Sequence, residues 1–410
     1  MSPESTRLII SLVSSVLPVT IMITIYVFYC KICMYQRRKP AKVAELESGN
    51  SNDQILTYRM DKFLNDIESQ KPIRFTSHHL TRATNNYSNM LGSGGFGSVY
   101  KGTLRNGTIV AVKVLRSSVS DKRMAEQFMA EVSTIGRVHH FNLVRLLGFC
   151  IETDKRALVY EYMSNGSLDK YLFSKNKILG FEKLHEIAVG TAKGIAYLHE
   201  ECNQRIIHYD IKPENILLDH DFCPKVSDFG LAKLCNREKS CVTMTGLRGT
   251  PGYAAPELWM PFRVTHKCDV FSFGMLLFEI IGRRRNLDVN LTESQEWFPR
   301  QVWIKFESEN LEELITDCGI LEDKEKVERM ARIAFWCVQY RPELRPIMSV
   351  VVKMLEGSMD IPNPSNPFQH LMEEDHATLE AAQKDISIDA VSSLEISKSS
   401  IVYETRTDSL

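Results

Sequence analysis

Residues 91–102 (LGSGGFGSVYKG) limit the possible folds of this chain more than any other feature. They contain the spacing G-x-G-x-x-G-x-V, and glycines at this spacing let backbone amides approach phosphate oxygens closely. The same spacing opens dinucleotide-binding folds, in which the loop leads directly into a helix. Here β-favouring residues follow instead, and residues 109–115 (IVAVKVL) form a second strand pattern. The sequence therefore predicts a hairpin of antiparallel strands that covers phosphates, with a glycine hairpin that binds no ligand as the alternative.

Lys113 lies inside the second strand pattern, where a lysine on a solvated face is the ordinary interpretation. An acidic partner is available in the amphipathic helix predicted over residues 121–138. Apolar residues recur there at spacings of four and three, and Glu131 falls on the same stripe. A carboxylate on a buried face is costly unless it is paired. We therefore expect Glu131 to pair with Lys113 and to direct its ammonium toward nucleotide phosphates.

Two polar loops further along the chain supply groups for phosphoryl transfer. Residues 206–219 (IIHYDIKPENILLD) contain H-x-D-x-K-x-x-N, and residues 228–230 read DFG. Asp210 can accept the proton of a substrate hydroxyl, and Lys212 can offset charge on the transferring phosphoryl group. Asn215 and Asp228 can hold Mg²⁺ through hard oxygen ligands, with Mn²⁺ as an alternative ion. These motifs in this order predict a catalytic site that uses ATP.

Three further residues are predicted to have structural roles. Residues 250–257 (TPGYAAPE) close an activation segment, and we expect Glu257 to pair with Arg345. Asp269 is expected to brace the backbone of the catalytic loop. The hydroxyls of the activation segment that are candidates for autophosphorylation belong to Ser240, Thr243 and Thr245.

Residues 8–30 carry no charge and are predicted to form a transmembrane helix. At 1.5 Å per residue they extend roughly 34 Å, enough to cross a hydrocarbon core of ~30 Å. Basic side chains gather after the span, between residues 31 and 42, so the positive-inside rule places the following chain in the cytosol. The alternative is a cleaved signal peptide, but the apolar run is longer than usual and no small-residue cleavage site follows it.

The predicted organisation has five parts. Residues 1–7 form a short extracellular N-terminus, 8–30 the transmembrane helix, 31–78 a cytosolic juxtamembrane linker, 79–357 the catalytic domain and 358–410 a disordered tail. The tail prediction rests on its prolines and on its content of Ser, Thr, Asp and Glu. The net charge of the whole chain is −1, so nothing indicates nucleic-acid binding.

Residues 74–357 resemble the plant receptor-like serine/threonine kinases, and the rust-resistance-kinase branch in particular. Besides the glycine loop, the stretches that carry the resemblance are LVYEYMSNGSLDKYLF at 158–173, HYDIKPENILLD at 208–219 and RGTPGYAAPE at 248–257. The resemblance implies an α+β, two-lobed protein kinase fold. A small, mainly antiparallel β lobe with one helix would join a larger helical lobe, and ATP would be held under the hinge between them.

The resemblance also implies which residues contact ATP. Tyr160 matches the gatekeeper position, and residues 161–163 match the hinge that hydrogen-bonds adenine. Val99, Ala111 and Leu217 match positions that sandwich the adenine ring. The complete expected set is Leu91, Gly92, Ser93, Gly94, Gly95, Phe96, Gly97, Val99, Ala111, Lys113, Tyr160, Glu161, Met163 and Leu217.

Two departures from the family pattern have consequences. Tyr209 precedes Asp210 where the commoner pattern has an arginine that meets a phosphate on the activation segment. Because Tyr209 cannot form a bidentate charged pair, we expect that phosphorylation there is not the switch for catalysis. By analogy, this class is associated with immune signalling. The second departure is the absence of a sizeable ectodomain, which implies a truncated gene product or a kinase that relies on the ligand-binding domain of a co-receptor.

Two other classes of function are weighed against a kinase that phosphorylates protein Ser/Thr hydroxyls. A pseudokinase scaffold is expected to lose a catalytic residue, but Lys113, Asp210, Asn215 and Asp228 are all present. A soluble metabolic nucleotide-binding enzyme would have no use for a membrane span or an activation segment. The sequence therefore favours a membrane-anchored kinase, with the plasma membrane expected from the resemblance.

The predicted topology can be tested in cells. We expect the full chain to remain in the membrane pellet after alkaline carbonate extraction, because residues 8–30 cross the bilayer. Its Asn86 sequon should stay unglycosylated, since a cytosolic asparagine does not meet the glycosylation machinery. A chain that lacks residues 8–30 is the control and should be released into the supernatant. Glycan on Asn86 would contradict the orientation.

Overall fold

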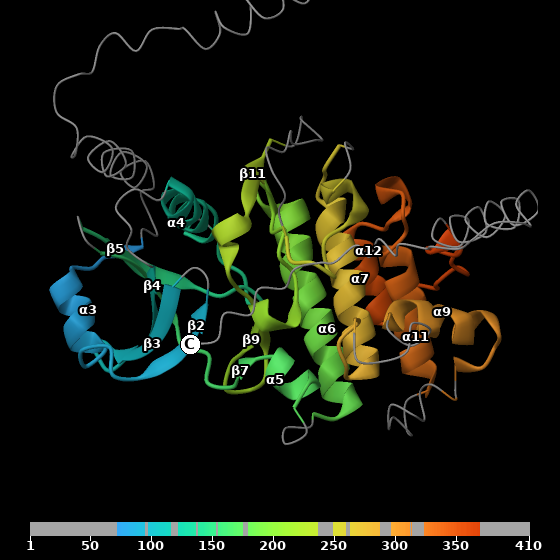
Figure 1. Ribbon diagram of the computed structural model, residues 1–410, viewed down its shortest axis with the longest axis horizontal. Helices are drawn as coiled ribbons and strands as arrows, with labels where there is room; N and C mark the ends of the chain where they lie inside the picture. Colours follow the sequence, from blue (N-terminus) through green and yellow to red (C-terminus); the bar gives the residue numbers. More distant parts are fainter. Residues whose placement is uncertain are drawn as a thin grey trace, which may run out of the picture. The chain divides into compact units, whose positions relative to one another are not determined.

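The computed structural model of the chain (Figure 1) describes residues 72–94, 97–115, 122–136, 138–152, 155–174, 179–236, 249–259, 263–287, 297–311, 313 and 324–369. The predicted span at 8–30, Gly95, Phe96 and the three candidate phosphorylation sites lie outside these residues. Within the described ranges, no helix has the length and apolar character needed to cross a membrane.

The small lobe is built on a six-stranded sheet in the order β1-β5-β6-β4-β3-β2. Its strands are β1 (Ile73–Arg74), β2 (Met90–Gly94), β3 (Gly97–Thr103), β4 (Ile109–Leu115), β5 (Leu146–Ile151) and β6 (Arg156–Glu161). All neighbouring strands are antiparallel except β1 and β5. The predicted antiparallel β lobe is therefore present, and the glycine-rich residues form the β2–β3 hairpin as expected.

The small lobe has two helices in the described chain, where one was predicted. The expected helix is α4 (Lys122–Ile135), and the additional one is α3 (Ser77–Ala83). Leu80 of α3 is fully buried against a sheet face that includes Val110 and Val159. Thr76 caps α3 by accepting a bond from the His79 amide at 3.2 Å. Sequence analysis missed this helix because its single buried residue gives no periodic signal.

The large lobe is helical, as predicted. Its helices are α5 (Asp169–Leu172), α6 (Phe181–Ala196), α7 (Lys267–Gly282), α9 (Phe298–Glu307), α11 (Lys324–Cys337) and α12 (Met348–Leu355). A π-helical turn, Tyr197–Glu201, extends α6. Short strands complete the lobe: β7 (Gly166–Ser167), β8 (Arg205–Ile207), β9 (Ile216–Leu218), β10 (Pro224–Val226) and β11 (Lys233–Cys235).

Helix α7 lies at the centre of the large lobe (Figure 1), in contact with α6, α9 and α11. It is buried nearly all round, which is typical of a helix surrounded by other elements. Helices α6 and α12 pack together beside it. This helical base supports the loops that carry the catalytic residues.

Packed structure extends beyond both predicted ends of the catalytic domain. Strand β1 and helix α3 begin before residue 79, the predicted start. At the other end, residues 358–369 pack against α11, and Phe368 is only 3% exposed. The prediction of a disordered tail from residue 358 is therefore wrong for this segment. Pro364, Pro367 and Phe368 are buried in the tertiary structure. Residues 370–410 lie outside the described ranges.

The predicted pair of Glu257 and Arg345 is present and buried. Nη1 and Nη2 of Arg345 lie 2.6 and 2.9 Å from the two carboxylate oxygens of Glu257. The guanidinium also donates to the carbonyls of Gln339, Lys267 and Tyr340. All five N–H groups of the arginine therefore have acceptors, which offsets the cost of burying its charge.

Removal of this arginine should destabilise the large lobe. We expect Arg345→Met to lower the free energy of unfolding by about 3–5 kcal/mol, because it leaves the Glu257 carboxylate buried without its cation. The measurement is urea unfolding followed by circular dichroism. The matched control is Lys193→Met, which breaks an exposed pair with Glu356 and should cost less than about 1 kcal/mol. Equal losses in the two variants would contradict the structural role of Arg345.

Candidate active site

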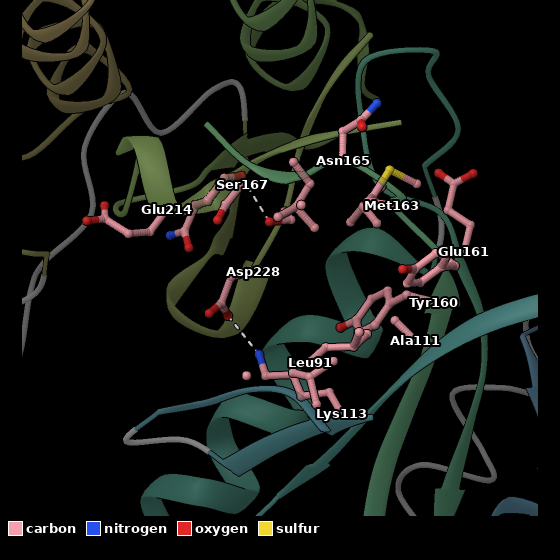
Figure 2. A pocket seen from close by; sticks show the side chains of 18 of the residues that line it. Leu91, Ala111, Lys113, Tyr160, Glu161, Met163, Asn165, Ser167, Glu214 and Asp228 are labelled. Atoms are coloured by element: carbon pink, nitrogen blue, oxygen red, sulfur yellow. Dashed lines mark hydrogen bonds and ion pairs between the residues drawn. The ribbon is translucent and has the colours of Figure 1, made fainter. Parts of the chain in front are cut away.

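A cleft of about 600 Å³ lies between the two lobes. Figure 2 shows the side chains that line it, with Ala111, Lys113 and Tyr160 on the side of the sheet. The predicted ATP contacts on its wall are Leu91, Gly92, Ser93, Val99, Ala111, Lys113, Tyr160, Glu161, Met163 and Leu217. Glu131, Asn215 and Asp228 also line the cleft. Gly94 and Gly97 lie in the adjoining hairpin rather than on the cleft wall.

Strand register explains why the residues on the sheet side of the cleft lie together. Ala111 and Lys113 are two residues apart on β4 and so share one face of the sheet. Val99 of β3 lies opposite Lys113, and Tyr160 of β6 lies opposite Ala111. Cross-strand partners project from the same face, so these four side chains form one surface above the cleft.

The glycines of the hairpin serve two different purposes. At Gly97, with φ of +147°, an added Cβ would lie 2.1 Å from the Val114 carbonyl oxygen, so the fold itself requires glycine. At Gly92 and Gly94 no atom of the described chain lies within 4 Å of the corresponding position. Packing does not require glycine there, whereas close approach of a ligand to the backbone does.

The predicted Lys113–Glu131 ion pair forms, and a third group joins it. Nζ of Lys113 lies 3.1 Å from Oε2 of Glu131 and 2.9 Å from Oδ1 of Asp228. The dashed line between Lys113 and Asp228 in Figure 2 marks the second contact. One ammonium on the sheet therefore connects helix α4 to the loop of the large lobe that carries Asp228.

The balance of burial and charge differs among these three groups. Burial opposes the charge of Lys113, but Glu131 and Asp228 outweigh it and raise the pKa of the ammonium. Burial raises the pKa of Glu131, in spite of the nearby ammonium. For Asp228, burial also acts upward, but Lys113 outweighs it and the pKa is lowered. Asp228 thus keeps its negative charge, which suits a metal ligand.

Tyr160 is a second partner of Glu131 on the same face of the sheet. Its hydroxyl donates a hydrogen bond to Oε1 of Glu131, while Lys113 contacts both carboxylate oxygens. Burial and the neighbouring carboxylate hold the pKa of the Tyr160 hydroxyl well above its usual range, so it remains a donor. Sequence analysis assigned Tyr160 to the adenine pocket and missed this bond, which depends on the distance between β6 and α4.

Three polar side chains surround the carboxylate of Asp210 in the catalytic loop. Lys212 Nζ lies 2.9 Å from Oδ2 of Asp210 and donates to the Thr250 hydroxyl at 2.7 Å. That hydroxyl in turn donates to Oδ1 of Asp210 at 2.5 Å. Asn215 Nδ2 donates to Oδ2 of Asp210 at 2.9 Å. The carboxylate is therefore oriented from three directions.

Asn215 and Asp228 emerge at the same end of the β9–β10 hairpin. Ile216 pairs with Val226, and the Ser227 amide donates to the Asn215 carbonyl at 2.9 Å. The amide nitrogen of Asn215 faces Asp210, an orientation that leaves its amide oxygen as a candidate metal ligand. Asp228 has a left-handed backbone, with φ of 61° and ψ of 74°. Such strained residues cluster at functional sites. The two oxygen donors fit a Mg²⁺ ion.

Asp269 braces the catalytic loop, as predicted. Its carboxylate accepts bonds from the amides of His208 and Tyr209, both at 2.8 Å. It also accepts a bond at 2.8 Å from Nε2 of His199, a fully buried histidine. Sequence analysis missed His199, because one histidine within an apolar helical run gives no signal for such a role.

Tyr209 occupies an apolar setting. It is only 2% exposed and belongs to a buried cluster with Cys235, Ala255, Leu258 and Cys268. These residues come from β11, the segment 249–259 and α7. The ring of Tyr209 therefore joins the catalytic loop to both described ends of the activation segment through apolar packing.

Comparison with known proteins agrees with this geometry. The family model for protein tyrosine and serine/threonine kinases matches residues 86–355. Rust resistance kinase Lr10 of Triticum aestivum is 47% identical over 319 residues, which cover 76% of this chain and 50% of that protein. A G-type lectin S-receptor-like serine/threonine-protein kinase of Arabidopsis thaliana is 50% identical over 300 residues, which cover 72% of this chain and 34% of that protein.

A third relative, the PR5-like receptor kinase of Arabidopsis thaliana, is 42% identical over 310 residues, 73% of this chain and 46% of that protein. The chain spans half or less of the length of these relatives. The two lobes and the ordered groups in and beside the cleft define a protein kinase. The chain belongs to the protein tyrosine and serine/threonine kinase family, and its predicted resemblance to plant receptor-like kinases is confirmed.

The bond between Tyr160 and Glu131 should matter for ATP use. We expect Tyr160→Phe to lower kcat/KM for ATP roughly tenfold, because a buried hydrogen bond to a charged group contributes roughly 1.5–3 kcal/mol. Steady-state kinetics at varied ATP concentration measure this effect. The control is Tyr162→Phe in the same hinge, where the phenol ring lies near Lys101 instead. Equal kinetics for parent and Tyr160→Phe would show that the hydroxyl does not hold Glu131 in place.

Proposed function

We propose that the chain is a serine/threonine protein kinase that transfers the γ-phosphoryl group of ATP to hydroxyls of protein substrates. The observation that carries this proposal is the position of Asp210, bonded to Thr250 and close to Lys212, beside a cleft that also holds Lys113 and Asp228. A proton acceptor and two cationic side chains are therefore available around one nucleotide-sized space.

Residues that line the cleft, and Asp210, Lys212 and Thr250 beside it, have separate roles in the proposed reaction. Asp210 accepts the proton of the substrate hydroxyl. The oxygen of that hydroxyl then bonds to the γ-phosphorus, while the bond from the γ-phosphorus to the ADP oxygen breaks. Lys212, 2.9 Å from Asp210, offsets charge on the moving phosphoryl group. Lys113, held by Glu131, binds the α- and β-phosphates. Thr250 keeps both Asp210 and Lys212 in position.

Asn215 and Asp228 are proposed to hold Mg²⁺, with Mn²⁺ as the alternative. A divalent ion bound there would neutralise charge on the phosphates. In the described chain Asp228 contacts Lys113. When ATP and the ion bind, Asp228 would give up this contact and coordinate the metal. Adenine is proposed to lie against Val99, Ala111 and Leu217, with the hinge at Glu161 and Met163 supplying hydrogen bonds. The glycine loop, including Gly95 and Phe96, would cover the phosphates.

Activity is proposed to be independent of phosphate on the activation segment. The support is the burial of Tyr209 in an apolar cluster with residues from both described ends of the segment. An uncharged anchor needs no arginine–phosphate pair to assemble. Phosphorylation of Ser240, Thr243 and Thr245 would then be a result of kinase activity rather than the switch that starts it.

The cellular setting is proposed from sequence and relatives together. A membrane span at residues 8–30 would leave the kinase domain, predicted as residues 79–357, in the cytosol at the plasma membrane. Receptor-type and immune signalling is proposed because one relative is named a rust resistance kinase. A co-receptor that supplies an ectodomain is the proposed partner.

Loss of the proton acceptor should abolish transfer. We expect Asp210→Asn in the full chain to lower kcat by about 10²–10⁴, because an amide cannot accept the hydroxyl proton. The measurement is incorporation of labelled phosphate from ATP with Mg²⁺ into the chain itself and into a serine/threonine peptide. The control is Asp221→Asn, an exposed carboxyl outside the cleft, which should keep parental activity. ATP binding without transfer by the parent would contradict the proposal and favour a scaffold.

A further inference from the structure

Residues 358–369, here called the strap, run along α11 in an ordered contact. Two side chains of α11 and one just after it donate to backbone carbonyls of the strap: Arg329 to Met359, Trp336 to Pro362 at 2.9 Å and Gln339 to Ser365 at 2.9 Å. The accepting carbonyls are three residues apart. A polyproline II helix has three residues per turn, so its every third carbonyl faces the same side. The prolines at 362, 364 and 367 agree with this conformation.

The strap ends on an aromatic anchor. Phe368, three residues beyond Ser365, is 3% exposed and meets the ring of Trp297 edge-on, with centroids 4.7 Å apart. Pro364 and Pro367 are buried with it, whereas Asn363 is exposed. The strap is therefore attached at both ends of its described length, to α11 and to the residue that precedes α9.

Trp297 contacts both the strap and residues in the interior of the large lobe. Its backbone forms a bridge with Leu287, and the amide of Phe298 donates to the Asn286 carbonyl at 2.8 Å. Asn286 is 4% exposed, and its own amide donates to Oε1 of Glu279 at 3.0 Å. Glu279 belongs to α7 and is 2% exposed.

The same carboxylate reaches the segment 249–259. Oε2 of Glu279 accepts a bond at 2.6 Å from the hydroxyl of Tyr253, which is itself buried. The Tyr253 amide donates to the carbonyl of Thr250 at 3.1 Å, and the Thr250 hydroxyl contacts Asp210. An unbroken series of contacts thus joins the strap to Thr250, the residue that orients the catalytic carboxylate.

We propose that the strap positions the segment 249–259 for the protein substrate, through Phe368, Trp297, Asn286, Glu279 and Tyr253. This inference rests on the proposed function, because it concerns the acceptor side of phosphoryl transfer. The segment 249–259 borders Asp210, where the substrate hydroxyl must arrive. The nucleotide side of the cleft is held separately by Lys113, Glu131 and the sheet. Loosening the strap should therefore weaken use of the protein substrate more than use of ATP.

The test compares Phe368→Ala with Asn363→Ala in the full chain. We expect Phe368→Ala to raise KM for a serine-containing peptide by about three- to tenfold, while kcat and KM for ATP change by less than about twofold. Backbone amides of residues 249–259 and 283–287 should exchange hydrogen faster, as measured by mass spectrometry. Asn363→Ala should behave as the parent in both measurements. Trp336→Phe, which keeps an aromatic ring but removes the indole N–H that donates to the Pro362 carbonyl, should shift the same quantities less.

Two results would overturn this inference. The first is a lower melting temperature for Phe368→Ala with unchanged peptide KM and unchanged amide hydrogen exchange at 249–259. In that case the strap only stabilises the fold. The second is additivity of Phe368→Ala and Tyr253→Phe in peptide KM, since a shared route predicts that the double variant is little worse than Tyr253→Phe alone. If the parent transfers no phosphate, the proposed function fails, and the exchange measurement still decides whether the strap holds the segment.

Discussion

The partly buried ammonium of Lys113, shared by Glu131 and Asp228, is the interaction on which the rest of the site depends. Each carboxylate comes from a different element, one from α4 and one from the loop after β10. A buried charge is tolerated only when it is paired, so the sheet, the helix and the loop must meet at one point. Burial raises the pKa of Glu131, whereas Lys113 holds that of Asp228 low. The group that keeps its charge is the one suited to bind a metal ion.

The two lobes contribute different parts of the site. The sheet offers a face on which Ala111 and Lys113 alternate with residues buried on the other side, and Gly97 lets two strands approach. The large lobe offers a rigid carboxylate, Asp269, which holds the backbone of the catalytic loop while Asp210 stays available. The nucleotide surface therefore comes mainly from strands, and the proton acceptor comes from a loop fixed by a buried helix.

The large lobe also joins distant parts of its own sequence through buried polar groups. Arg345 fastens Glu257 at the end of the activation segment, and Glu279 bonds both Tyr253 and Asn286. These contacts surround the segment that carries Thr250. Since buried hydrogen bonds are costly to break, these contacts favour one arrangement of the acceptor side of the cleft. Tyr209 adds an apolar contact to the same region.

The sequence by itself determined the order of the motifs and the pair Lys113–Glu131, because periodicity and the cost of unpaired burial can be read locally. The two-lobed fold was expected from the family resemblance, and the pair Glu257–Arg345 from the motifs that contain these residues. The sequence did not reveal helix α3, the support from His199, the bond from Tyr160 to Glu131 or the packing of residues 358–369. Each of these depends on a distance between elements far apart in the chain. Only the tertiary structure sets such distances, since a single histidine, tyrosine or proline-rich stretch has the same local pattern whether or not a partner lies across from it.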